Sequence, residues 1–593
     1  MDSEPSRLGR LTVSRTRTRS SSRSLSHVIR PQQQRINTGT NFQKVVSAKS
    51  FDDHVAYSPP SATSEEGNSN DKEQGTTAFG LEQSEKKPHP TGDETSSTYS
   101  HTPESSPVDK DLEKNEPSNL QPEPSKDPFL VTWDGPNDPL NPKNWSGKRK
   151  WAATFVVSSF TFISPVSSSM VAPAMQAMKA DLHLDSDFLA SMILSIFVLA
   201  YAVGPLFLGP LSEVYGRVIV LQLSNLVYLV WNLACGFART GPEMLVFRFL
   251  SGLGGSAPLA IGGAVLGDLF FAEQRGKAVS IYSLAPLLGP AIGPIAGGFV
   301  TANTTWRWIF YATTIADALI QVSGFFFLQE TYVPILLQRK AAKLRKETGN
   351  DAYYTEFDHK NESLRQTLST AAVRPFIMLF TQPIIQCIAF YMAYLYGLMY
   401  LMLSTFPQLW TVQYGFSTSI GSLHYIALGT GFFLGTQISA PINDRVYRRL
   451  KKSNNGVGRP EFRVPLMIAG SLFIPIGLFW YGWAAQAHTH WIVPDIGAAI
   501  FCAGTIVCFQ SMQTYIVDGY TRYAASGIAA AVVLRSLAGF GFPLFAPSMY
   551  NALGFGWGNS LLAFVGIAIG VPAPIIFWKY GEQLRAKSKF ASG

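Results

Sequence analysis

The chain has 593 residues, of which 47% are hydrophobic and 15% charged, and its formal net charge is +8. These averages combine a polar stretch, residues 1–148, with a series of apolar segments long enough to cross a bilayer at ~20 residues each. The positive charge therefore does not indicate nucleic-acid binding. The four cysteines all lie in apolar segments, which argues against a disulfide framework, and no ligand cluster indicates a metal site.

Residues 1–148 are predicted to form a disordered cytoplasmic tail. Its first thirty residues are rich in Arg and Ser, and Ser, Thr, Pro, Glu and Lys dominate the rest, so the stretch cannot bury enough apolar surface to fold. A mitochondrial transit peptide is also rich in Arg and Ser, but it needs apolar residues for an amphipathic helix. We therefore favour a regulatory tail with phosphorylation sites, and we expect no cleaved signal peptide.

Twelve apolar segments follow the tail and predict an all-α integral membrane protein. The predicted spans are residues 151–171, 188–210, 218–238, 244–266, 278–300, 308–328, 384–406, 420–442, 464–484, 496–517, 525–548 and 560–578. They divide the chain into five predicted parts, which are the tail (1–148), an N-terminal six-helix bundle (149–328), a cytoplasmic middle loop (329–375), a C-terminal six-helix bundle (376–580) and a short cytoplasmic C-terminal tail (581–593).

Positive charge alternates between the connecting loops. Lys and Arg gather before span one, after spans two and four, in the middle loop, after span eight and after span twelve, whereas the opposite loops hold few of them. The positive-inside rule then predicts that both termini are cytoplasmic.

The two six-span halves share a short sequence pattern. The loop after span two reads G-P-L-S-E-V-Y-G-R and the loop after span eight reads A-P-I-N-D-R-V-Y-R. In this alignment Glu213 matches Asp444, and Arg217 matches Arg448. The matched position in each half indicates duplication, which is common in transporters.

Span five carries small residues and prolines at helical spacing. Gly289, Gly293 and Gly297 form one bare stripe, and Pro290 and Pro294 follow the same period. Small residues let helices approach closely in a membrane, and neighbouring helices can satisfy the backbone groups that prolines free. From these residues alone, simple close packing and a specific function are both possible.

The topology and three motifs resemble the major facilitator superfamily, and most closely its fungal twelve-span drug:proton antiporters. The loop after span two is similar to motif A at Gly209, Leu211, Ser212, Gly216 and Arg217, while Glu213 replaces the usual Asp and Val214 a usual base. Span four is similar to motif B at Arg248, Gly252, Gly254 and Gly255. Span five is similar to motif C at Gly289, Pro290, Gly293, Pro294, Gly297 and Gly298.

The resemblance implies roles for these residues. Motif C implies proton-coupled antiport rather than import. The family resemblance also implies a cytoplasmic gate formed by Gly209, Glu213, Gly216, Arg217, Asp268 and Arg275. For Asp268 and Arg275, charge that only sets the membrane topology is an equal alternative. The resemblance also implies a part in proton transfer for Arg248. The alternative is a side chain that extends its charge to the membrane interface. Asp317 is the only carboxylate near a span centre, and it is either a protonation site or a structural hydrogen-bond partner.

In the resembled fold, spans one, four, seven and ten line a central cavity. Candidate cavity residues are Tyr391, Tyr394, Tyr396, Tyr400, Gln510, Gln513 and Thr514. Aromatic rings interleaved with Met can repack around varied apolar ligands, and aromatic faces attract cations. The set predicts an amphipathic cavity with no obvious site for a phosphate or a strong anion.

These observations predict a proton-coupled exporter of amphipathic or cationic small molecules in the plasma membrane, working as a monomer. No ATP-binding signature occurs, so we expect the proton gradient to supply the energy, without a cofactor, and we expect no catalytic residues. The alternative is an exporter dedicated to one secondary metabolite or a polyamine, although cavity carboxylates for a polyamine are missing. A nutrient importer and a membrane sensor are further alternatives, and motif C argues against import.

Overall fold

A computed structural model describes residues 127–358 and 364–590 of the chain. Within these ranges the regular structure is helical, apart from one isolated β-bridge between Leu130 and Tyr354. Ten of the described helical segments are long and apolar enough to cross a membrane. The prediction of an all-α membrane protein is confirmed.

The N-terminal half contains the first six predicted spans. Its helices are α1 (Gly147–Ser169), α2 (Met175–Asp181), α3 (Asp187–Tyr215), α4 (Arg217–Phe237), α5 (Gly241–Gly255), α6 (Ala257–Leu269), α7 (Ala272–Asn303) and α8 (Arg307–Phe327). Predicted span four is divided between α5 and α6, where Gly254 and Gly255 precede Pro258. Gly216 joins α3 to α4 with φ of 104°, a conformation that glycine adopts without steric cost.

The C-terminal half contains the other six spans. Its helices are α11 (Pro383–Gln408), α12 (Thr418–Leu423), α13 (Tyr425–Ser453), α14 (Val464–Gln486), α15 (Ile492–Gly519), α16 (Ala524–Gly570) and α17 (Pro572–Ala586). A π-helical turn, η3 (Leu409–Gln413), follows α11, and a 3₁₀ turn, η4 (Pro460–Arg463), precedes α14. Gly554, with φ of 69°, interrupts α16 between predicted spans eleven and twelve.

The middle loop is also helical in part. It contains α9 (Val333–Thr348) and the start of α10 (Leu364–Thr381), which runs past the predicted boundary at residue 376. Basic residues end α9, and Gly349 closes it in the left-handed conformation that favours glycine.

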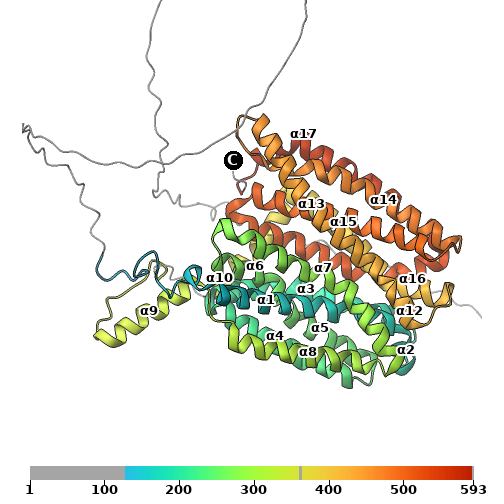
Figure 1. The fold of residues 1–593 in the computed structure, drawn as a ribbon, viewed down its shortest axis with the longest axis horizontal. Coiled ribbons are helices and arrows are strands. Elements are labelled where there is room, and N and C mark those ends of the chain that lie inside the picture. Colours follow the sequence, from blue (N-terminus) through green and yellow to red (C-terminus); the bar gives the residue numbers. More distant parts are fainter. Residues whose placement is uncertain (1–126, 359–363, 591–593) are drawn as a thin grey trace, which may run out of the picture. The chain divides into compact units, whose positions relative to one another are not determined.

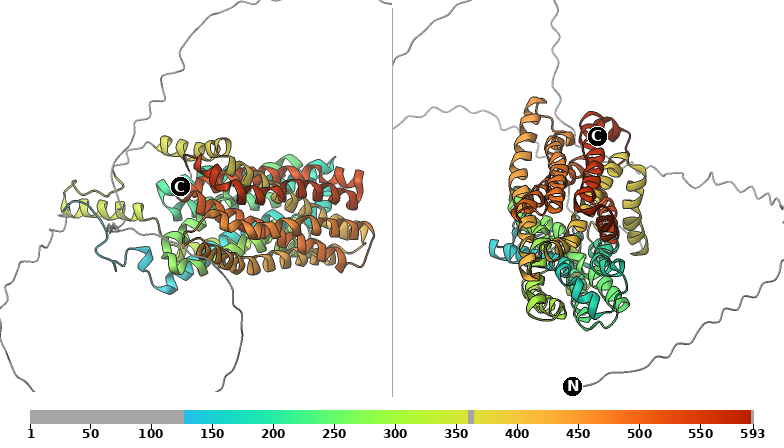
Figure 2. Two further views of the ribbon diagram at one scale, coloured as in Figure 1. Left: turned by 90° about the horizontal axis from the view of Figure 1, so that it is seen from above. Right: turned by 90° about the vertical axis from the view of Figure 1, so that its right-hand side faces the viewer.

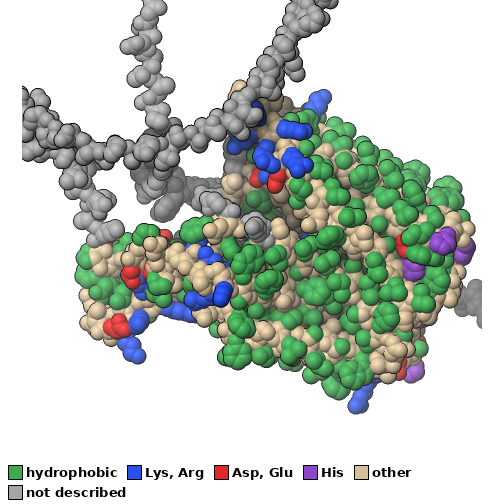
Figure 3. Space-filling model, viewed as in Figure 1, with side chains coloured by type: hydrophobic (Ala, Val, Ile, Leu, Met, Phe, Trp, Pro, Cys, Tyr) green, Lys and Arg blue, Asp and Glu red, His purple; other side chains and the backbone are tan. Residues whose placement is uncertain are grey.

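The two halves lie side by side (Figures 1 and 2), with α1–α8 in blue to green and α11–α17 in orange to red. They meet where α3 packs against α16, and where α7 packs against α12 and α13. Hydrophobic side chains cover most of the face in Figure 3, and charged side chains gather at its two ends. Large apolar side chains such as Phe325 (80% exposed) and Phe380 (75%) point outward, as a lipid-facing surface requires.

The predicted tail is ordered in its last part, which corrects the expectation of disorder up to residue 148. The Val131 N–H donates to Tyr354 (2.7 Å), and the Lys340 ammonium on α9 lies 2.6 Å from Asp134 and 3.6 Å from Asp138. Burial tends to raise the pKa of Asp138, but backbone N–H donors and Lys340 hold it below its usual value. The sequence did not reveal this order because residues 127–148 contain few apolar side chains. The contacts that hold them are backbone and charged contacts with the middle loop. Residues 1–126 lie outside the described part.

Candidate functional site

The glycine stripe of α7 packs directly on α1. A Cβ on Gly289 would lie 2.7 Å from the Pro165 side chain, and a Cβ on Gly293 would lie 2.5 Å from the Ser169 hydroxyl. A Cβ on Gly297 would collide with the Met170 carbonyl. Because two of these three neighbours cannot move without moving the α1 backbone, the stripe sets how closely the two helices approach. Pro290 and Pro294 are buried within α7, which remains helical through them.

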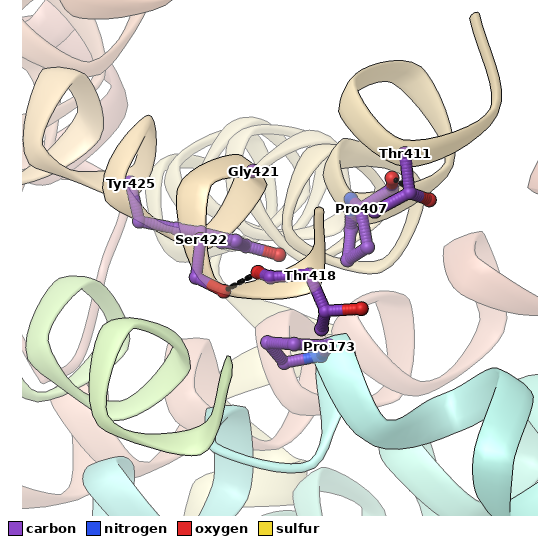
Figure 4. Close-up of a pocket in the computed structure, with 7 residues that line it drawn as sticks. All are labelled: Pro173, Pro407, Thr411, Thr418, Gly421, Ser422 and Tyr425. Carbon is purple, nitrogen blue, oxygen red and sulfur yellow. Dashed lines mark hydrogen bonds between the residues drawn. The ribbon is translucent and has the colours of Figure 1, made fainter. Parts of the chain in front are cut away.

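Gly298 continues the stripe across to the other half of the molecule. A Cβ there would overlap the Ser422 hydroxyl of α12, which donates to the Thr418 carbonyl. Figure 4 shows Ser422 and Thr418 beside a small pocket that is lined by Pro173 of the N-terminal half and Pro407 of the C-terminal half. The halves therefore touch at the end that the charge pattern predicts to be outside.

Arg248 is fully buried within the N-terminal half and does not extend to the interface. Its Nε donates to the Ile193 carbonyl (3.1 Å), and its two Nη atoms donate to the carbonyls of Ser167 and Ser168 (3.1 Å each). Its guanidinium also lies 4.6 Å from the centre of the Phe197 ring. Backbone carbonyls of α1 and α3 thus surround the cation, and in the described residues it has no carboxylate partner.

Asp317 is also fully buried, in the seam between α8 and α4. Both of its oxygens accept from the Asn225 amide, at 3.1 and 3.0 Å, and the same amide donates to Gln321 (2.8 Å). No described Lys, Arg or His forms an ion pair with it. The structure thus contains the hydrogen bond to a neighbouring helix that was one of the two alternatives for Asp317. Asp317 and Arg248 do not contact each other. A proton-carrying role for either residue stays a prediction.

The predicted gate residues assemble around Arg217 at the predicted cytoplasmic end. The Arg217 guanidinium lies 3.6 Å from Asp268 and 3.8 Å from Glu213, and it donates to the Ser212 hydroxyl (2.7 Å). Glu213 remains half-exposed, and the described residues give it no partner in the C-terminal half. A Cβ on Gly209 would meet open space, so packing does not require glycine there. The side chain of Arg275 lies outside what the structure describes.

The predicted cavity tyrosines divide into two pairs. Tyr391 and Tyr394 point into the C-terminal half, where the Tyr391 hydroxyl lies 3.7 Å from the Cys508 sulfur and Tyr394 donates to the Leu562 carbonyl. The helical period turns both side chains toward α15 and α16 in this structure, and their part in lining a cavity stays a prediction. Tyr396 and Tyr400 face the other half instead.

The second pair reaches the N-terminal half through α1. The Tyr400 hydroxyl lies 3.2 Å from that of Ser168, and the rings of Tyr396 and Tyr400 are 5.0 Å apart. One turn earlier on α1, the Ser164 hydroxyl forms a hydrogen bond of 2.6 Å with the Tyr201 hydroxyl of α3. A strip of hydroxyl groups therefore crosses the junction between the halves.

The predicted polar residues of α15 are partly engaged within the C-terminal half. The Gln510 side chain accepts from Ser439 (2.5 Å), and the Thr514 hydroxyl donates to the Gln510 carbonyl (2.9 Å). Gln513 is half-buried, and of the three it is the one whose side chain has no hydrogen bond in the described part of the chain.

The sequence profile of the Major Facilitator Superfamily matches residues 157–543. The chain belongs to this family. It is 54% identical over 488 residues to "Efflux pump vrtL" of Penicillium aethiopicum, covering 82% of this chain and 96% of the relative. It is 47% identical over 463 residues to an uncharacterized transporter of Schizosaccharomyces pombe, covering 78% and 94%. This major facilitator protein is thus a multi-pass membrane transporter and not an enzyme.

Solved structures agree on the fold. The partially occluded, inward-open xylose transporter XylE of E. coli superposes with a TM-score of 0.56 at 15% identity, covering 73% of this chain and 98% of XylE. A bacterial homolog of the human lysosomal transporter Spinster gives a TM-score of 0.54 at 14% identity, covering 75% and 99%. These similarities establish the major facilitator fold.

The sequence did not single out Glu330, which contacts the backbone of Arg217 in the predicted gate. Its carboxylate accepts from the backbone N–H groups of Arg217 (3.0 Å) and Val218 (3.2 Å), so it caps the N-terminus of α4, where negative charge is favourable. A Cβ on Gly216 would collide with this carboxylate. In the sequence, Glu330 is visible only as an acidic residue shortly after predicted span six. Its role could not be inferred because its partners lie more than 100 residues earlier in the chain.

The C-terminal half of the transporter repeats this charge cluster with a different arginine. Arg463, at the start of span nine, lies 2.9 Å from Asp444 and 2.9 Å from Asp518. Asp518 is near the end of span ten, as Asp268 is near the end of span four, so Arg463 is the spatial counterpart of Arg217. The alignment of Arg217 with Arg448 was wrong in this respect. Among the described residues, the Arg448 side chain donates to the Asp444 carbonyl and forms no ion pair.

Proposed function

We propose that this transporter exports amphipathic small molecules across the plasma membrane in exchange for protons, by alternating access. Both termini would lie in the cytoplasm, and the protein would work as a monomer driven by the proton gradient without a cofactor. The names of relatives such as "Efflux pump vrtL" and "Efflux pump radE" of Floropilus chiversii, which is 42% identical, support export.

The observation that carries the proposal is the packing of the motif C helix. In α7, Gly289 and Gly293 fix the helix on α1, and Gly298 contacts Ser422 across the two halves. One continuous helix therefore connects the interior of the N-terminal half to the contact between the halves at the predicted outer end. Opening of that end requires α12 to leave α7, so a helix of this kind controls release of cargo to the outside.

Proton coupling is supported by the buried polar groups of the N-terminal half. Asp317 is buried, and its one partner in the described part of the chain is a neutral amide. In such an environment a carboxyl group gains or loses a proton without breaking an ion pair. Arg248 holds α1 against α3 close to the α1–α7 contact. Protonation of Asp317 would act on the α4–α8 seam, and the cycle would couple that seam to α7 through α1.

Purified protein in liposomes tests the proposal. We expect an imposed proton gradient to drive the transported dye uphill. Protons should move in the opposite direction to that dye, and a second, pH-sensitive dye in the lumen reports their movement. Addition of a protonophore should stop the uphill flux. Dye movement that continues uphill after the protonophore would contradict proton coupling, and movement only down the dye gradient would contradict active export.

A further inference from the structure

Arg535 is a cation within the membrane-spanning part of α16, and no carboxylate among the described residues forms an ion pair with it. It lies eleven residues after Ala524, which begins the helix, so at a rise of about 1.5 Å per residue it is ~16 Å along the span. Its side chain is half-buried, and its Nε is buried without a hydrogen-bond partner. No ion pair or hydrogen bond joins it to any residue in the described ranges 127–358 and 364–590.

The surroundings of Arg535 place it at the junction between the two halves. Its guanidinium lies 5.0 Å from the centre of the Tyr396 ring, which is paired with Tyr400 and, through it, with Ser168 of α1. One turn further along α16, a Cβ on Gly539 would lie 2.8 Å from Tyr396 and 3.1 Å from Val198 of α3. Arg535 is therefore next to the strip of hydroxyl groups that crosses between the halves.

Comparison with Arg248 shows what Arg535 lacks. Arg248 is surrounded by backbone carbonyls that accept from its guanidinium, as a permanent structural cation requires. The buried carboxylates of α8 and α15 have other partners, because Asp317 is bonded to Asn225 and Asp495 lies 2.7 Å from His424. Since an arginine stays charged and offers five N–H donors, an unpaired one at membrane depth indicates a partner that arrives from outside the described chain.

We propose that Arg535 binds the acidic group of the transported molecule and selects amphipathic organic anions as cargo. A carboxylate or a deprotonated acidic hydroxyl would pair with the guanidinium, for which bidentate hydrogen bonds are the favoured geometry. The apolar body would lie against the rings of Tyr396, Tyr400 and Phe509, the last 6.1 Å from Tyr396. This inference rests on the proposed export function, and it replaces the expected cationic cargo with an anionic one.

The charge of the cargo also determines how the membrane potential acts on transport. Exchange of one cation for one proton moves no net charge. Exchange of one anion for one proton moves two positive charges inward, since an anion leaves while a proton enters. An anion exporter should therefore be accelerated by a potential that is negative on the cytoplasmic side, whereas a cation exporter with the same stoichiometry should not.

Two dyes that share a xanthene ring test the proposal, namely the anion fluorescein and the cation rhodamine 6G. We expect wild-type protein in liposomes to transport fluorescein faster when a K⁺ gradient with valinomycin makes the cytoplasmic side negative. Arg535→Gln should reduce fluorescein transport and binding, the latter by anisotropy of the purified protein, by at least about tenfold. Arg535→Lys should restore part of both. Arg459→Gln, which removes an exposed arginine paired with Glu582, is the matched control and should change neither.

Several outcomes would overturn the proposal. Wild-type protein that fails to bind fluorescein, or that transports rhodamine 6G and not fluorescein, excludes an anion site. Equal loss of both dyes in Arg535→Gln assigns the residue a structural role, and unchanged fluorescein binding in that variant excludes contact with the anion. Uphill fluorescein export that is sensitive to Arg535 but indifferent to a protonophore would leave the anion site in place and contradict only the proposed proton coupling.

Discussion

Gly298 of α7 and Ser422 of α12 lie on different halves of the transporter, and the space between them is too small for one Cβ. The contact has two consequences. It places motif C, which runs up the α1–α7 seam, at the predicted outer closure. It also means that a side chain at this position should oppose the closed arrangement without disturbing either half internally.

The first prediction concerns this contact. Gly298→Val should leave the protein folded and membrane-inserted but shift it away from the arrangement that is closed at the predicted outer end, because Val cannot fit against Ser422. Cross-linking of cysteines introduced at Pro173 and Pro407, which line the same pocket from the two halves, measures the closure. We expect cross-linking to fall severalfold and export to be lost. The control is Gly263→Val, where a Cβ would meet open space.

Gly293→Leu is a second prediction, within the N-terminal half. The nearest atoms to a Cβ at this position are the Ser169 hydroxyl at 2.5 Å and the Val166 carbonyl at 2.7 Å, and the carbonyl cannot yield without moving α1. We expect normal amounts of the protein in the membrane and no export. Retained export would mean that the glycine stripe only tolerates close packing and does not set the position of α7.

The third prediction separates the two interpretations of Asp317. Asp317→Asn keeps a side chain of the same shape that can still bond Asn225 through its carbonyl oxygen, but it cannot exchange a proton. Cargo transport should then lose its dependence on the pH gradient while thermal stability changes by less than ~1 kcal/mol, the usual size of one exchanged hydrogen bond. Asn225→Ala serves as the comparison, since it removes the bond and leaves the acid. If Asp317→Asn retains cargo-driven proton movement, Asp317 is structural.

The sequence predicted the membrane part of this fold well, because span length and apolarity are local properties. All twelve predicted spans fall on helices, and the repeat between the halves was visible from the loop after span two. Contacts between residues far apart in the chain were harder to predict from the sequence. Arg463 replaces Arg448 as the counterpart of Arg217 because spatial equivalence depends on how span nine starts, not on the aligned loop.

The same limit applies to the candidate site. Tyr391 and Tyr396 carry identical signals in sequence, yet one faces Cys508 within its own half and the other faces Arg535 at the junction. Only the rotation of α11 decides between them, and an unbroken apolar span gives no period that would reveal that rotation. That no described carboxylate pairs with Arg535 likewise became visible only once the partners of Asp317 and Asp495 were known.

The fourth prediction concerns Glu330 and the gate. Glu330→Gln should weaken two charge-assisted bonds to the first turn of α4 and release Arg217 from its position beside Asp268, because the carboxylate fixes the backbone of Arg217 itself. Loss of a helix-capping carboxylate costs about 0.5–2 kcal/mol, so the purified variant should melt at a lower temperature. Export should fall further than the stability loss alone explains, since the gate loses its alignment.

Glu582→Gln, in an exposed ion pair with Arg459, is the matched control for removal of one cytoplasmic carboxylate and should leave both properties near wild type. Equal behaviour of the two variants would show that Glu330 supplies only surface charge at the cytoplasmic end.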